Sequence, residues 1–248
     1  MLFEFRRLRK VLASTFGRNK AITLDRSVGI EQSFLRLKRK NLEIESFINI
    51  GAGHGDDIEF FMKYFPNMRS LFIDMDSRFL GTWKKLAQKY EGLQYVICGA
   101  SSEDGVGRFL KSNDVGGALV PNSNTSKDFY ETPLRRIDSL VAEHNLPGPY
   151  FLKFDTHGVE LDILSGASTT LENTSLIMME VYNFKLDFID RKNLTFDEMS
   201  LHMKSLGFKC IDFCEPLFRP KDFAFWQMHM LFIRQDHPIW RRGCYSAL

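Results

Sequence analysis

The sequence predicts a doubly wound α/β domain around a mostly parallel sheet of seven strands, closed by an antiparallel strand. Three observations lead to this prediction. From residue 46 onward, short apolar runs alternate with amphipathic runs of helix length, which is typical of βαβ units. A glycine-rich turn lies between the first apolar run and the first helical run. The length of 248 residues suits one such domain with additions.

The predicted elements follow one another in regular order along most of the chain. Seven apolar runs should form the sheet, at residues 47–50, 70–73, 93–98, 150–154, 175–181, 208–213 and 228–233. Five amphipathic runs should form helices, at residues 57–64, 77–90, 137–144, 159–171 and 196–206. Ser77 is the expected N-cap of the second helix. Residues 99–135 interrupt the alternation, and their glycines and polar residues predict a hairpin and a long loop.

The chain divides into three parts. Residues 1–45 carry Leu and Phe at helical spacing and should form a helical extension, residues 46–236 should form the main domain, and residues 237–248 a tail. The extension begins with a basic arm that contains Arg6, Arg7, Arg9 and Lys10. This arm could contact an anionic membrane surface, pack on its own domain, or pack on a second subunit of a homodimer.

The composition excludes several classes of protein. Apolar residues make up 44% of the chain and charged residues 26%, which disfavours a disordered or fibrous protein. The net charge of +2 is too small to imply a nucleic-acid partner. No run approaches the roughly 20 apolar residues that cross a bilayer, and the start shows no apolar stretch of secretory length. The four cysteines lack a Cys-x-x-Cys spacing, so we expect no metal site and reduced thiols in a cytoplasmic protein.

The most specific local feature is the turn at residues 49–56, Asn-Ile-Gly-Ala-Gly-His-Gly-Asp. Glycines in such a turn let the backbone approach a ligand closely. The pattern is close to a dinucleotide fingerprint, but Asp56 stands where the third glycine would be, and its charge would repel a pyrophosphate. A cationic sulfonium ligand tolerates that charge. The candidate cofactor contacts here are Asn49, Gly51, Ala52, Gly53 and Gly55.

Two further segments are candidates for contact with a nucleoside ligand. Asp74 ends the second strand and could accept hydrogen bonds from both ribose hydroxyls, with Met75 beside it. Asp76 is the competing choice, and both carboxylates could instead cap the following helix. Ala100 and Ser101 leave the third strand where adenine lies in such folds, although a plain turn explains them equally well.

A second group of polar residues lies in the block 153–167, Lys-Phe-Asp-Thr-His-Gly-Val-Glu-Leu-Asp-Ile-Leu-Ser-Gly-Ala. Asp155 ends a buried strand, where α/β sheets place ligands and chemistry. His157 and Glu160 are three residues apart and can face the same side, although Glu160 could also be a first-turn helix charge. His157 is a natural general base near neutral pH. Glu180 ends the next strand.

Taken in order, these features resemble the FkbM-type methyltransferase family across roughly residues 47–235. That family has a glycine turn after a strand, an acidic residue after the second strand, a K-[IF]-D-x-[EQ]-G-x-E-x-x-[IL]-x-G-A block, and an acidic strand end. The resemblance implies a class I methyltransferase fold, S-adenosylmethionine as cofactor with S-adenosylhomocysteine as product, and usually O-methylation of a sugar or polyketide-like hydroxyl. Asn49, His54 and His157 depart from the residues more common in the family.

We therefore expect an S-adenosylmethionine-dependent O-methyltransferase that acts on a hydroxylated small molecule or a glycan. The expected catalytic residues are Asp155, His157, Glu160 and Glu180, with Asp155 also near the cofactor and either Asp155 or His157 as the base. The turn 155–158 does not resemble the Asn-Pro-Pro-Tyr turn of base-methylating enzymes, so no nucleic acid is expected. The alternatives are a catalytically silent scaffold of this fold and a nicotinamide-dependent oxidoreductase.

Overall fold

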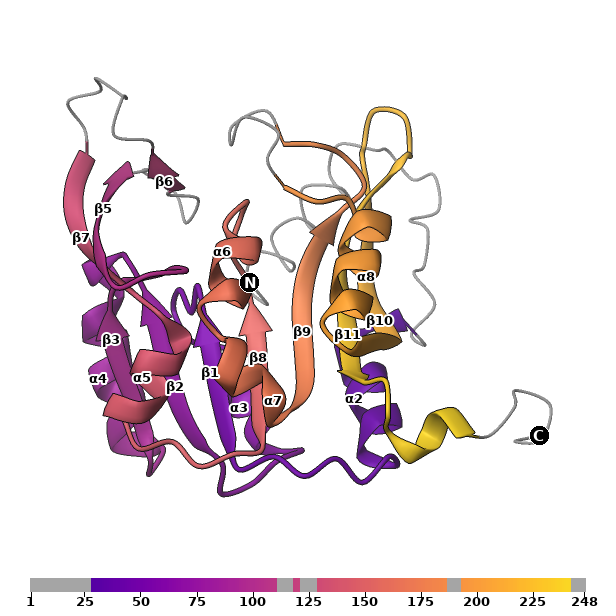
Figure 1. Ribbon diagram of the computed structural model, residues 1–248, viewed down its shortest axis with the longest axis horizontal. Helices are drawn as coiled ribbons and strands as arrows, with labels where there is room; N and C mark the ends of the chain where they lie inside the picture. Colours follow the sequence, from indigo (N-terminus) through magenta and orange to yellow (C-terminus); the bar gives the residue numbers. More distant parts are fainter. Residues whose placement is uncertain (1–27, 111–117, 121–128, 187–192, 242–248) are drawn as a thin grey trace, which may run out of the picture.

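A seven-stranded sheet forms the centre of the protein, in a computed structural model that describes residues 28–110, 118–120, 129–186 and 193–241 (Figure 1). The strand order is β10-β11-β9-β8-β1-β2-β3, and only β11 runs antiparallel to its neighbours. The predicted fold is therefore confirmed. The strands are β1 (Ser46–Ile50), β2 (Arg69–Asp74), β3 (Leu93–Ile97), β8 (Tyr150–Phe154), β9 (Thr174–Tyr182), β10 (Phe208–Phe218) and β11 (Phe225–Arg234).

Helices cover both faces of this sheet, and each helix layer buries its own hydrophobic cluster (Figure 1). One layer consists of α2 (Ile30–Lys38), α3 (Ile58–Met62) and α4 (Leu80–Lys89). The other consists of α5 (Ile137–Glu143), α6 (Glu160–Ser165), α7 (Ser168–Glu172) and α8 (Phe196–Ser205). Because side chains alternate along a strand, the two clusters take alternate residues of the same strands.

Two helix predictions differ from the structure. The helix expected over residues 159–171 is divided into α6 and α7 at Gly166, where a Cβ would lie 2.0 Å from the carbonyl oxygen of Ser101. The second expected helix begins as a 3₁₀ turn, η2 (Ser77–Phe79). Ser77 is not its N-cap: the Asp76 carboxylate caps the turn by accepting the backbone N–H of Arg78. The notebook of local signals overlooked that Asp is as good a cap as Ser.

The segment 99–135 forms a second sheet beside the β2–β3 side of the first (Figure 1). Its strands are β4 (Gly99–Ala100), β5 (Gly105–Leu110), β6 (Ala118–Val120) and β7 (Phe129–Arg135), in the order β4-β7-β5-β6. The predicted hairpin is present, whereas much of the expected long loop is strand. Residues 111–117 and 121–128 lie outside the described residues, as do residues 1–27 with the basic arm, 187–192 and 242–248.

Helix α2 joins the end of the expected N-terminal extension to the main core. Phe34 is fully buried and contacts the rings of Phe61 and Phe151, while Arg36 forms a two-pronged salt bridge with Asp212 on β10. The three-part division of the chain stays a prediction. Among the described residues, none of the helices has the length and apolar character needed to cross a membrane.

The strand order reverses at β1, since β2 pairs on one side of it and β8 on the other. In open α/β sheets, ligands bind at such a reversal, outside the carboxyl ends of the strands. The turn at 51–57, the end of β2 and the loop after β8 all meet at this edge. The fold therefore brings together the segments in which the sequence placed its candidate site.

Candidate functional site

The three glycines of the first turn have different neighbours, although all have positive φ. A Cβ on Gly51 would lie 2.3 Å from the backbone oxygen of Asp155, and one on Gly55 would lie 2.3 Å from the ring of Phe72. At Gly53, a Cβ would meet nothing within 4 Å. Gly51 and Gly55 are thus required by packing, whereas Gly53 faces open space where a ligand can approach the backbone.

The Asp74 carboxylate holds the turn and the end of β2 together. One of its oxygens accepts the N–H of Gly53 at 2.9 Å and the other accepts the N–H of Asp76 at 3.0 Å. Burial raises the pKa of Asp74, an effect that these hydrogen bonds partly offset. Each oxygen has a second lone pair for a ribose hydroxyl. Asp76 is engaged differently, since its carboxylate caps η2 and pairs with the Arg78 guanidinium, which favours Asp74 over Asp76 for the ribose.

Asn49 and Ala52 lie below the turn on the α2–α4 face of the sheet. Asn49 is fully buried, and neither its amide nitrogen nor its amide oxygen has a hydrogen-bond partner among the described residues. Because buried polar groups in folded proteins are nearly always hydrogen-bonded, this orphaned amide suits a polar ligand group. The Ala52 methyl belongs to the hydrophobic cluster, so this residue offers its backbone to the turn rather than its side chain to a ligand.

The expected adenine segment is held from two sides. Ala100 pairs with Arg135 of β7, and the Ser101 N–H donates to the Arg135 carbonyl at 2.9 Å. The side chain of Met75 packs close to Gly99, and its carbonyl accepts the Tyr130 hydroxyl at 2.8 Å. Sequence reasoning gave Tyr130 no part in this site, because its distance from Asp74 in the sequence conceals the contact across two sheets.

A buried lysine organises the carboxylates at the end of β8. The Lys153 ammonium lies 2.8 Å from an Asp57 oxygen and 2.9 Å from an Asp155 oxygen. Burial alone would lower the pKa of Lys153, but the charges of Asp155 and Asp57 raise it overall. Burial alone would raise the pKa of Asp155, but the Lys153 charge and its hydrogen bonds lower it overall. Asp155 is therefore a paired anion and a poor proton acceptor.

Glu180 continues this group on the neighbouring strand. Its carboxyl group is hydrogen-bonded to Asp155 and to the hydroxyl of Tyr182, and it accepts the side-chain amide of Gln227. Burial first, and the charge of Asp155 second, raise the pKa of Glu180 well above its ordinary value. Two carboxyl groups in contact share one proton, so Glu180 is the protonated member of this pair.

His157 lies at the end of the group, on the loop after β8. Its Nδ1 is 3.0 Å from the hydroxyl of Tyr182. Burial lowers the pKa of His157, so the imidazole is neutral near pH 7. Glu160, expected to face the acceptor or to hold His157, instead accepts the N–H of Gly158 with both oxygens and the hydroxyl of Thr156. Glu160 thus anchors the loop that carries His157.

Several polar residues of the site escaped sequence reasoning. Asp57, Lys153, Tyr182, Gln227 and His229 come from four different elements, and only the fold brings them together. One local signal was available: a lysine inside the otherwise apolar strand Tyr-Phe-Leu-Lys-Phe is rarely buried without a partner. No group of three or more His, Cys, Asp or Glu side chains in the described ranges is arranged to hold a metal ion.

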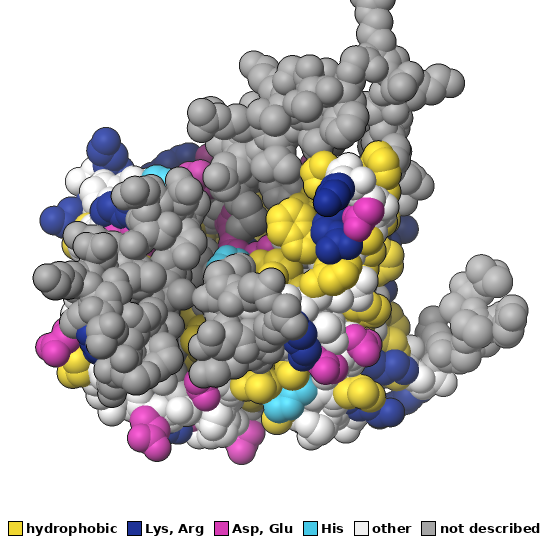
Figure 2. Space-filling model, turned by 90° about the horizontal axis from the view of Figure 1, so that it is seen from above, with side chains coloured by type: hydrophobic (Ala, Val, Ile, Leu, Met, Phe, Trp, Pro, Cys, Tyr) yellow, Lys and Arg dark blue, Asp and Glu magenta, His cyan; other side chains and the backbone are white. Residues whose placement is uncertain are grey.

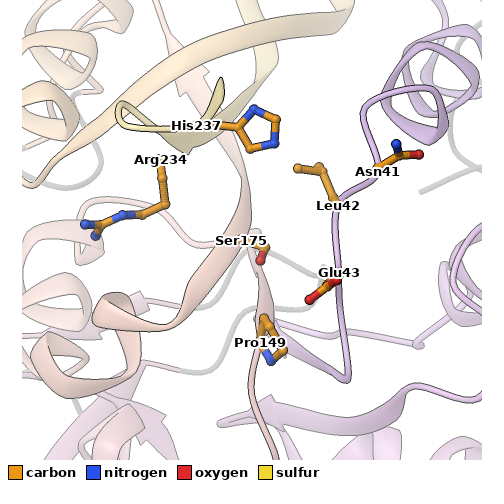
Figure 3. Close-up of a pocket in the computed structure, with 7 residues that line it drawn as sticks. All are labelled: Asn41, Leu42, Glu43, Pro149, Ser175, Arg234 and His237. Carbon is orange, nitrogen blue, oxygen red and sulfur yellow. The ribbon is translucent and has the colours of Figure 1, made fainter. Parts of the chain in front are cut away.

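Figure 2 looks onto the edge where these segments meet, with acidic and histidine side chains in a hollow and hydrophobic side chains along one flank. The surface cavity drawn in Figure 3 lies at the opposite edge, before β1 and β8 and at the start of β9. Its lining includes Leu42, Pro149 and Ser175. Since the carboxyl ends of the parallel strands are at the other edge, this cavity has no part in the site.

The sequence matches the model of the methyltransferase FkbM domain over residues 24–210. The chain belongs to this family. The family uses S-adenosylmethionine, and the chain is assigned as a methyltransferase with this cofactor. A comparison with curated protein sequences gives no significant match.

Solved methyltransferase structures resemble this chain at low sequence identity. A 1,6-didemethyltoxoflavin-N1-methyltransferase from Burkholderia thailandensis is 15% identical, with 94% of this chain and 90% of that chain covered and a TM-score of 0.44. The N-methyltransferase NodS from Bradyrhizobium japonicum is 9% identical, with 83% and 94% covered and a TM-score of 0.45. A precorrin-6y C5,15-methyltransferase from Geobacter metallireducens is 12% identical, with 90% and 95% covered and a TM-score of 0.41.

The residues at the edge of the sheet fit this cofactor. Gly53 leaves room against its backbone, Asp74 presents a carboxylate for ribose hydroxyls, and Asn49 offers a buried amide to a polar group. The roles of the individual residues stay predictions, as do those of Met75, Ala100 and Ser101. S-adenosylmethionine supplies an electrophilic methyl group on a sulfonium, so the protein's own task is to bind, orient and deprotonate an acceptor.

Proposed function

We propose that this methyltransferase transfers the methyl group to a hydroxyl oxygen of a sugar, a glycan or a secondary metabolite, with His157 as the general base. The observation that carries the proposal is the neutral imidazole of His157, held by Tyr182 at the end of the β8 loop beside the cofactor turn. A hydroxyl needs to lose its proton as its oxygen gains a methyl group, and a neutral imidazole is suited to accept it near pH 7.

The contacts of Asp155 decide between the two candidate bases. Asp155 shares hydrogen bonds with Lys153 and Glu180, and its pKa is lowered overall, so it has little affinity for another proton. His157 lies on the loop that Glu160 anchors, where the imidazole can be oriented toward an acceptor. In this scheme the acceptor O–H bond breaks, its proton passes to Nε2 of His157, and the oxygen forms the new bond to carbon.

The acceptor, the partners and the location remain part of the proposal. We propose a cytoplasmic enzyme that acts on a hydroxylated small molecule or glycan and not on nucleic acid. The basic arm would contact an anionic membrane or a second copy of the chain. Residues 1–27 lie outside the described ranges, so liposome flotation and sedimentation of the full chain, with the four basic residues of the arm changed to Ser as a control, would test these two partners.

Two measurements test the proposed function. Isothermal titration with S-adenosylhomocysteine should show binding that Asp74→Ala weakens about 10–100-fold, since two hydrogen bonds to a charged group are lost. Asp76→Ala, which removes a cap but no proposed cofactor contact, is the matched control and should change the Kd less than about threefold. Equal effects of the two variants would contradict the assignment of Asp74.

Methyl transfer is then measured from labelled S-adenosylmethionine to a panel of p-nitrophenyl glycosides and hydroxylated macrolides. His157→Gln should lower kcat about 10²–10⁴-fold, which is the usual contribution of a general base. His202→Gln, on the outer helix α8, should leave kcat unchanged. Binding of S-adenosylhomocysteine without transfer to any of these acceptors would support the catalytically silent alternative, and an unchanged rate in His157→Gln would exclude His157 as the base.

A further inference from the structure

The buried polar side chains between α3 and the loop after β8 form one continuous hydrogen-bonded chain. It runs from Asp57 through Lys153, Asp155, Glu180 and Tyr182 to His157. Lys153, Glu180 and Tyr182 are each less than a tenth exposed, so water contributes little to their hydrogen bonding. The direction in which each proton is donated is therefore set within the protein.

The direction can be followed from the lysine outward. An ammonium group can only donate, so Asp155 accepts from Lys153. The contact between Asp155 and Glu180 needs one proton, and Glu180 carries it because its pKa is raised and that of Asp155 is lowered. Glu180 has then used its only proton, and the hydrogen bond between Glu180 and Tyr182 has to use the proton of the Tyr182 hydroxyl.

The same count fixes the last link. Tyr182 has donated its only proton to Glu180, so its oxygen can serve His157 only as an acceptor. Nδ1 of His157 must then carry a hydrogen, and in the neutral imidazole Nε2 carries the lone pair. We propose that Tyr182 is a positioning residue that holds neutral His157 in the Nδ1–H tautomer, with Nε2 as the basic nitrogen.

The catalytic importance of this tautomer rests on the proposed function, whereas the tautomer itself does not. A general base needs its lone pair on the nitrogen that meets the acceptor, and the second nitrogen needs a fixed partner so that the ring keeps its orientation. When Nε2 gains the acceptor's proton, Nδ1 keeps its own, and the imidazolium donates to the Tyr182 oxygen. Tyr182 itself need not lose or gain a proton.

The test reads the tautomer directly, without an acceptor. The protein with ¹⁵N-labelled histidines is examined by long-range ¹H–¹⁵N correlation, which distinguishes protonated from unprotonated ring nitrogens. The chain has six histidines, and the His157→Gln spectrum identifies the His157 signals by their loss. Above the pKa of His157, the wild-type spectrum should show Nδ1 protonated and Nε2 unprotonated. An Nε2–H tautomer in the wild type overturns the proposal.

Three variants separate positioning from general stability. Tyr182→Phe removes the acceptor and should shift the tautomer ratio toward Nε2–H on the order of tenfold, the effect of one hydrogen bond. Tyr150→Phe is the matched control: Tyr150 is 9% exposed against 7% for Tyr182, and its hydroxyl donates to the Leu146 carbonyl. It should leave the His157 signals unchanged. An unchanged ratio in Tyr182→Phe contradicts the proposal.

Glu180→Gln tests the shared proton. A glutamine amide can donate to Asp155 through N–H while its carbonyl accepts from Tyr182, so this variant should keep the Nδ1–H tautomer. Glu180→Leu should lose it, and equal spectra for both variants would contradict the chain. Titration with S-adenosylhomocysteine is run on the same samples. Failure to bind this ligand would count against the proposed function alone, while the wrong tautomer would count against Tyr182 alone.

Discussion

The face of the sheet that carries α2, α3 and α4 has two halves of opposite character. Near the amino ends of the parallel strands, it is packed with aromatic and aliphatic side chains. Two residues further along each strand, at the carboxyl ends, the same face is polar. The change runs from Phe47 to Asn49 on β1, Phe151 to Lys153 on β8, Met178 to Glu180 on β9, and Leu231 to His229 on the antiparallel β11.

This comparison separates stability from function within one layer. The aromatic half gains free energy by burial, whereas the polar half buries charged and polar groups at a cost that hydrogen bonds offset only in part. Asn49 and His229 even lack hydrogen-bond partners among the described residues. The aromatic half thus supports a polar half that would be unstable by itself, as is common where strain and desolvation serve a site. Four predictions test this division.

The largest expected effect is in the aromatic half. Phe151 is fully buried, with its ring centroid 4.8 Å from that of Phe47 and 5.1 Å from that of Phe61. Phe151→Ala should reduce the free energy of unfolding by about 3–5 kcal/mol, measured by urea denaturation. Phe151→Leu should cost less than about 1.5 kcal/mol. The Kd for S-adenosylhomocysteine should stay unchanged in both, and a large change would show that the two halves are not separable.

In the polar half, the largest effect should follow removal of the lysine. Lys153→Met leaves Asp57 and Asp155 as buried, unpaired charges and should cost about 3 kcal/mol of unfolding free energy. The triple variant Asp57→Asn, Lys153→Met, Asp155→Asn removes those charges and should be more stable than the single variant. A triple variant that is less stable would mean that the ion pairs themselves, rather than the stranded charges, determine the cost.

The buried imidazole of His229 predicts a dependence of stability on pH. Burial lowers its pKa to about 4, and the nearby groups are Asp155, Lys153 and Asp57, with the Glu215 carboxylate 3.5 Å away. The unfolded chain takes up the proton near pH 6.5 and the folded chain only near pH 4, so stability falls as the pH drops between these values.

The size of this effect follows from the same two pKa values. Between pH 7 and pH 5, His229 should reduce the unfolding free energy by about 2 kcal/mol. His229→Phe should remove that part of the pH dependence, while His202→Phe on α8 should remove less because His202 is only half-buried. Denaturant titrations at both pH values measure it, and identical pH profiles for wild type and His229→Phe would refute the explanation.

The smallest effect on stability is expected at the glycine turn. Gly53→Ala places a Cβ in open space, so only the positive φ opposes it, at about 1 kcal/mol. The same methyl group would stand where the cofactor approaches, and the Kd for S-adenosylhomocysteine should rise at least about tenfold. Gly81→Ala is the control: it also meets nothing within 4 Å, but it lies in α4 and should slightly stabilise the protein. Unchanged affinity in Gly53→Ala would remove this residue from the binding site.

Local pattern alone determined much of this protein. The alternation of apolar and amphipathic runs, the glycine turn and the block 153–167 were sufficient for the fold, the family and the cofactor, because each depends on residues close together in the sequence. Asp74 was found in the same way, since the end of a strand can be recognised locally. The segment 99–135 was harder to predict because β4, β5 and β7 pair across distant residues.

Only the tertiary structure decided how the site residues divide their tasks. From sequence, Asp155 and His157 were equal candidates for the base; the register that sets Asp155 beside Glu180, and Lys153 beneath both, separates them. Tyr182 shows no local signal at all, and its contact with His157 joins residues 25 apart. The physical reason is that a proton's position depends on burial and on partners from neighbouring strands, which strand register determines and local sequence does not.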